Sequence, residues 1–133
     1  MIDYEVKIFN MAYNAAAHLC ANKKFVSTIL TSPLTSFPAA SLIEMDNATI
    51  RRYQSSTPVE NFALITYQLE VYATTKSECR TVYAAVDEAM IAMNFSRISG
   101  MYINNPDNTK VFRYVARYEA VVDPDGNLYR RSA

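Results

Sequence analysis

The sequence is poor in the residues that ligand and metal chemistry most often use. It has two glycines, two cysteines, one histidine and no tryptophan among its 133 residues. With only Gly100 and Gly126, the chain has no glycine-rich loop to cradle a phosphate. His18, Cys20 and Cys79 lack the spacing of a metal site such as C-x-x-C, and two cysteines are too few for a disulfide framework. We therefore expect no cofactor, no metal and no disulfide scaffold.

A catalytic signature is also missing. His18 lies in a helical pattern beside Leu19 and Cys20, and no Ser-His-Asp or Cys-His arrangement can be built from the sequence without assuming the fold. The acid pair Asp87 and Glu88 is typical of a solvated helix face rather than of paired glycosidase carboxylates. We expect no enzyme activity.

Excess charge and long apolar runs are absent as well. Thirteen basic and thirteen acidic residues cancel, so no broad field attracts nucleic acid or an anionic membrane. The longest uncharged run, 25–43, contains Pro33 and Pro38, which predicts strands and a turn rather than a membrane span. The start, MIDYEVKIF, has acids where a secretory signal has bases, so we expect a reducing cytosol and a single domain over 1–133.

The apolar periodicity predicts the element order α-β-β-β-α-β-β, with a short last strand. An amphipathic helix with Asp3 as N-cap is expected over 3–21, and a second helix is expected from the capping box of Thr75 and Glu78 to about Asn94. The first helix is expected to bury a stripe of Val6, Phe9, Tyr13, Ala16 and Cys20. Strands are expected near 23–32, 37–45, 62–74, 95–103 and 111–122, a loop over 46–61, and a turn at 123–126. This order predicts an α+β fold with one antiparallel or mixed sheet of about five strands and both helices on one face.

The two longest predicted strands have one apolar face and one mixed face. Successive side chains of a strand point to opposite faces. In VFRYVARYEAVV, one face carries Phe112, Tyr114, Ala116, Tyr118, Ala120 and Val122. The other carries Val111, Arg113, Val115, Arg117, Glu119 and Val121, and in strand 62–74 the corresponding residues include Leu64, Gln68 and Glu70. Such a mixed face favours a protein–protein interface; the alternative is a half-solvated sheet face of a monomer.

Five segments in this order resemble the tail terminator (tail completion) proteins of long-tailed bacteriophages. They cover nearly the whole chain: MIDYEVKIFNMAY, FPAASLIEMDNATIRR, ENFALITYQLEVYA, ECRTVYAAVDEAMIAMNFSR, and FRYVARYEAVV followed by LYRR. The resemblance implies a ring of six subunits at the head-proximal end of the tail tube, which stops tube growth and joins the tail to the head connector. It implies as partners the major tail tube protein and the connector or stopper protein, with DNA only as cargo in the lumen and no membrane. The implied location is the virion, and the host cytoplasm during assembly.

Two parts of the chain are the candidate subunit contacts under this resemblance: the loop 46–60 and the arginine-bearing strand. The candidate interface residues are Arg51, Arg52, Tyr53, Glu70, Arg113, Arg117 and Glu119. Pro58 and Phe62 depart from the more polar residues expected in that loop. Two other functions stay open: a head-completion or minor capsid protein of the same virion, and an RNA-binding α+β module. For the RNA-binding module, the strand sequence lacks the aromatic–glycine pattern of an RNP motif.

Overall fold

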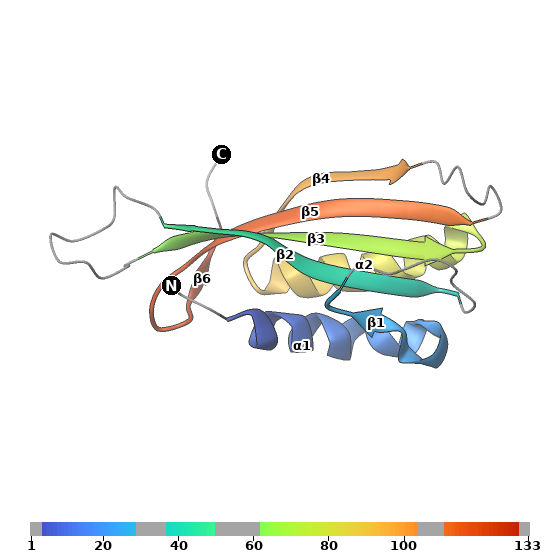
Figure 1. Cartoon of the computed structure of the whole chain (residues 1–133), viewed down its shortest axis with the longest axis horizontal. Coiled ribbons are helices and arrows are strands. Elements are labelled where there is room, and N and C mark those ends of the chain that lie inside the picture. Colours follow the sequence, from blue (N-terminus) through green and yellow to red (C-terminus); the bar gives the residue numbers. More distant parts are fainter. Residues whose placement is uncertain (1–3, 29–36, 50–61, 104–110, 131–133) are drawn as a thin grey trace, which may run out of the picture.

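A computed structural model describes residues 4–28, 37–49, 62–103 and 111–130. Its elements are α1 (Glu5–Ala16), two 3₁₀ turns (Ala17–Leu19 and Ala21–Lys23), β1 (Phe25–Val26), β2 (Ala39–Thr49), β3 (Ala63–Ala73), α2 (Lys76–Ala92), β4 (Ser96–Ile103), β5 (Phe112–Val122) and β6 (Leu128–Tyr129). Both helices lie on one face of the sheet (Figure 1). The predicted α+β fold and its element order are confirmed.

The sheet is mixed, with strand order β1-β2-β3-β5-β4, and β6 pairs with β5. The β1–β2 pair is parallel and all the others are antiparallel. The two long strands β3 and β5 therefore lie side by side at its centre, and β4 lies at one edge (Figure 1).

The core fills the space between the sheet and the helices. On β3 the buried apolar residues are Ala63, Ile65, Tyr67, Leu69, Val71 and Ala73, and on β5 they are Tyr114, Ala116, Tyr118, Ala120 and Val122. This inner face is the apolar face that the period of two predicts.

The second helix follows its prediction closely. The backbone N–H of Glu78 donates to Oγ1 of Thr75 at 3.1 Å, so the predicted N-cap is present. Four of its residues, spaced three and four apart, are buried: Cys79, Val82, Val86 and Met90. Asn94 follows the helix with φ 71, in the left-handed region that asparagine tolerates at helix ends.

The first helix differs from its prediction in length and in face. α1 ends at Ala16 and 3₁₀ turns follow; Tyr4 is its N-cap, and Asp3 lies outside the described residues. Val6, expected in the core, is 74% exposed, and Ile8 and Ala12, outside the predicted stripe, are buried. The rest of the stripe is confirmed, because Ala16 and Cys20 are buried and Phe9 and Tyr13 pack half-buried against the core. Ile8, Ala12 and Ala16 follow one another at intervals of four residues, so they share one face of the helix.

Candidate interaction surface

The sheet face away from the helices is the candidate functional surface, called here the outer face. In β3 and β5 it comprises Leu64, Thr66, Gln68, Glu70, Tyr72, Arg113, Val115, Arg117, Glu119 and Val121. Both helices lie on the opposite side of the sheet (Figure 1). The predicted assignment of the two faces of β3 and β5 is therefore confirmed.

Two of the candidate interface residues pair with each other inside one chain. Arg113 and Glu70 form an ion pair on the outer face. The Glu70 side chain is 7% exposed and that of Arg113 is 31% exposed. The hydrogen bond to Glu70 raises the pKa of Arg113, and the guanidinium lies 5.8 Å from the ring centroid of Tyr72. Both charged groups are therefore paired within a single subunit. The sequence did not predict this pairing.

Arg117 is in a different situation. Its Nε donates to Oε1 of Gln68 at 3.0 Å, and the residue is exposed. Among the residues that the structure describes, it has no carboxylate partner. Glu119, two residues further along β5, is half-buried. The outer face thus presents one cation that is held by a neutral side chain, which leaves its charge available to an acid of another molecule.

A shallow groove of 410 Å³ runs over the outer face between β4 and β5. It is lined by Gln68, Ser99, Met101, Ile103, Arg113, Val115 and Arg117. Met101 is 58% exposed. The groove therefore combines apolar surface with two guanidinium groups, the composition of an interface centre with a charged rim.

The remaining sequence-based candidates have different outcomes. Arg51, Arg52 and Tyr53 lie outside the described residues. The start of the expected loop is wrong, because 46–49 continue β2 and pair in register with 63–66 of β3. Phe62, which departs from the family pattern, packs edge-on against Tyr129 with 6.3 Å between ring centroids.

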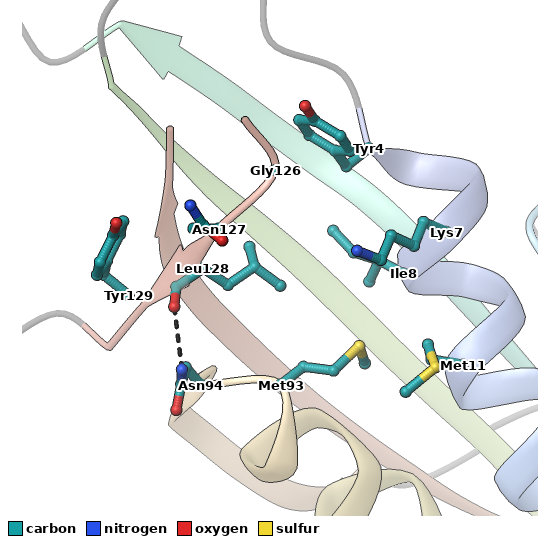
Figure 2. A pocket seen from close by; sticks show the side chains of 10 residues that line it. All are labelled: Tyr4, Lys7, Ile8, Met11, Met93, Asn94, Gly126, Asn127, Leu128 and Tyr129. Atoms are coloured by element: carbon teal, nitrogen blue, oxygen red, sulfur yellow. Dashed lines mark hydrogen bonds between the residues drawn. The ribbon is translucent and has the colours of Figure 1, made fainter. Parts of the chain in front are cut away.

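A second surface lies at the opposite side of the molecule, and the sequence did not predict it. The helix cleft, as we call it, is a pocket of 560 Å³ among α1, the end of α2 and the turn before β6 (Figure 2). Its lining residues are Tyr4, Lys7, Ile8, Met11, Met93, Asn94, Gly126, Asn127, Leu128 and Tyr129.

Two hydrogen bonds fix the walls of the helix cleft. The Tyr4 hydroxyl donates to the carbonyl of Pro124 at 2.7 Å. Asn94 Nδ2 donates to the carbonyl of Leu128 at 3.0 Å, the bond drawn in Figure 2. Among the described lining residues Lys7 is the only charged one, and Ile8, Met11, Met93 and Leu128 are aliphatic. Such a site suits a side chain or a chain segment of a partner. The signal in the sequence was Met11, an apolar residue outside the predicted stripe of the first helix.

Metal-ligand clusters and exposed thiols are absent from the described residues. They contain no group of three or more His, Cys, Asp or Glu residues that could hold a metal ion. Cys20 and Cys79 are buried, and burial raises the pKa of each thiol to about 11, which keeps both protonated and unreactive. His18 is exposed in a 3₁₀ turn. In the described part of the chain, no helix has the length and apolarity to cross a membrane.

Comparisons with known proteins do not add a family. No protein-family model matches the chain, and no curated protein sequence matches it. The outer face and the helix cleft are therefore the features on which a functional proposal can be built.

Proposed function

We propose that the chain is a tail terminator, a structural virion protein that closes into a ring of six subunits at the head-proximal end of a phage tail tube. The observation that carries this proposal is the outer face. It exposes apolar and cationic side chains together, and within the described ranges Arg117 is bonded to Gln68 and to no carboxylate. That combination suits a protein partner better than water, because interfaces join apolar area to charges that set the register.

The arrangement of the two surfaces also suits a ring. A cyclic assembly uses heterologous contacts, in which two different patches of one subunit meet. The helix cleft is lined by residues of α1, the end of α2 and the turn before β6. Both helices lie on the face of the sheet opposite to the outer face (Figure 1). With one surface used between subunits, the other remains to dock the tail tube or the head connector.

The protein would work by shape rather than by chemistry. Its thiols are buried and protonated, and the charged groups of the groove are a matched pair and one arginine bound to an amide. Neither arrangement provides a general base or a nucleophile in contact with a pocket. The resemblance to tail terminators indicates where in the virion the ring would lie.

Electron microscopy of the purified chain mixed with tail tubes of the phage that encodes it tests the proposal. We expect one ring at one end of each tube, about six subunits per tube by mass measurement, and no further growth at that end. Decoration along the whole tube, or on the capsid shell, contradicts the proposal. Salt-dependent retention of single-stranded RNA on a filter, without tube binding, would favour the RNA-binding alternative.

A further inference from the structure

The groove on the outer face is accessible and positively charged. Both helices lie on the other side of the sheet (Figure 1). Arg117 and Ser99 are exposed, and Met101 is 58% exposed. The described lining residues of the groove include two arginines and no acid. An acidic surface with some apolar area would therefore complement this groove in both charge and polarity.

The C-terminal half of α2 carries the opposite charge. Residues 84–92 contain two acids and no basic residue. Asp87 is used within the chain, because its Oδ1 accepts from the Tyr118 hydroxyl at 2.8 Å and lies 3.3 Å from Nη1 of Arg97. Glu88 is exposed and has no cationic partner in the described part of the chain. One acid of this helix is therefore available to another molecule.

The same side of α2 also carries apolar surface. Four exposed residues follow one another along the helix at spacings of three and four: Ala84, Glu88, Ile91 and Ala92. Residues at these spacings share one side of a helix. Ile91 is 42% exposed. This side of α2 therefore combines a carboxylate with apolar side chains, as the complement of the groove requires.

The spacing of the charged and apolar side chains is similar on the two surfaces. Glu88 and Ile91 are three residues apart on one helix, so their Cβ atoms lie about 5–6 Å apart. In the groove, Arg117 pairs in register with Ser99, and Met101 follows two residues along β4. Arg117 and Met101 are thus diagonal neighbours, about 7–8 Å apart. One placement of the helix sets Glu88 against Arg117 and Ile91 against Met101.

We infer that the subunits join head to tail, with the exposed side of 84–92 in α2 of one copy seated in the outer-face groove of the next. This inference rests on the ring of the proposed function and names the two surfaces that build it. The contact is heterologous, as a cyclic assembly requires. It gives the sheet a helix on its second face, a layer arrangement that is common in proteins. Arg117 gains a carboxylate partner at every contact.

An exchange of charges tests the contact. Arg117→Glu sets two carboxylates against each other at the contact, and Glu88→Arg sets two guanidinium groups against each other, so each variant alone should form no rings on tail tubes. The double variant, with both substitutions in one chain, restores an opposite pair at each contact and should form rings. Glu88 and Arg117 cannot pair within one chain, because α2 and the outer face lie on opposite sides of the sheet (Figure 1).

A mixture of the two single variants gives a second test of the same contact. Two variants in equal amounts can alternate around an even-numbered ring, and each contact then joins a substituted residue to its substituted partner or an unmodified residue to its unmodified partner. Every contact is attractive in that arrangement. We expect the mixture to cap tubes, although neither variant does so alone.

Matched controls separate this contact from general effects of charge and polarity. Arg80→Glu, at an exposed residue in the N-terminal half of α2, and Asp125→Arg, in the exposed turn before β6, should form rings as the unmodified chain does. Met101→Gln removes apolar area from the groove and should lower the fraction of capped tubes, whereas Met45→Gln, at a methionine of similar exposure on β2, should not. Circular dichroism melts show that each variant is folded, and the methionine variants keep the test valid if a charge-reversal variant does not fold.

The outcomes distinguish this inference from the proposed function. Rings formed by either single charge-reversal variant, or equal capping by the two methionine variants, overturn the contact and leave the terminator proposal standing. A folded double variant or a mixture of folded single variants that forms no rings also overturns the contact. Failure of the unmodified chain to cap tubes overturns both.

Discussion

Alternate residues of the same central strands form the two faces of the sheet. The two faces differ in how fully a single chain buries or pairs their side chains. The inner face of β3 is apolar and almost wholly buried under the helices. The outer face carries the Arg113–Glu70 pair, which forms within the chain, and Arg117, whose partner among the described residues is the amide of Gln68. The inner face therefore accounts for most of the stability of the subunit, whereas Arg117 on the outer face has no carboxylate partner in the described part of the chain.

The strongest contrast is expected between two adjacent residues of β3. Leu69 is fully buried and Gln68 lies on the outer face. Leu69→Ala should lower the free energy of unfolding by about 2–5 kcal/mol, because it removes buried apolar volume and leaves a cavity. Gln68→Ala should change it by less than about 1 kcal/mol. Urea denaturation of both variants measures the difference, and equal losses would contradict the assignment of faces.

Glu70 should behave as a structural residue although it lies on the outer face. Its side chain is 7% exposed and paired with Arg113. Glu70→Gln removes the charge but keeps the shape, so Arg113 loses its partner and unfolding should become easier by about 1.5–3 kcal/mol. Arg113→Gln, made with Glu70→Gln, should recover part of this loss, because no unpaired charge remains. A double-mutant cycle from urea melts gives the coupling, and zero coupling would show that the pair is not formed.

Gly100 should tolerate a side chain poorly at the edge of the inner face. A Cβ at this position would collide with the hydroxyl of Tyr114. That ring is held by stacking on Tyr83, with 3.9 Å between centroids, and by edge contact with Tyr102. Gly100→Ala should therefore lower stability by about 1 kcal/mol, although alanine normally stabilises an unstrained strand position. Ser99→Ala, beside it and exposed, is the control; if both variants melt alike, Tyr114 moves aside without cost.

Arg117→Glu should have the smallest effect on stability and a complete effect on assembly. Arg117 is exposed and its bond to Gln68 is a surface contact, so the melting temperature should stay within about 2 °C of the unmodified value. Arg113→Glu should be more destabilising, because it puts two carboxylates together on the outer face. Scanning calorimetry compares the two. Unfolding or aggregation of Arg117→Glu at room temperature would place Arg117 in the internal network of the subunit.

Local patterns in the sequence predicted the parts of this structure that depend on interactions between residues close in the chain. The faces of β3 and β5 follow from alternation, and the start of α2 follows from the Thr75 and Glu78 capping box. The features that the sequence did not predict depend on residues that are distant in the chain. The strand character of 46–49 comes from pairing with 63–66, and the Glu70–Arg113 pair joins residues 43 positions apart. The helix cleft is formed by three elements together, so the sequence of any one segment could not predict it.

The hydrogen bond from Tyr4 to Pro124 joins residues 120 positions apart, and it has a consequence for the order of events during synthesis. The first helix leaves the ribosome long before the turn that it is tied to, and β4 has no described partner strand until β5 follows it. Folding of such a non-local topology completes late and slowly. A chain cut short before β5 would lack both the neighbour of β3 and the support of β4. Unfinished chains would thus lack the centre of the sheet, and only chains that include β5 could present the outer face.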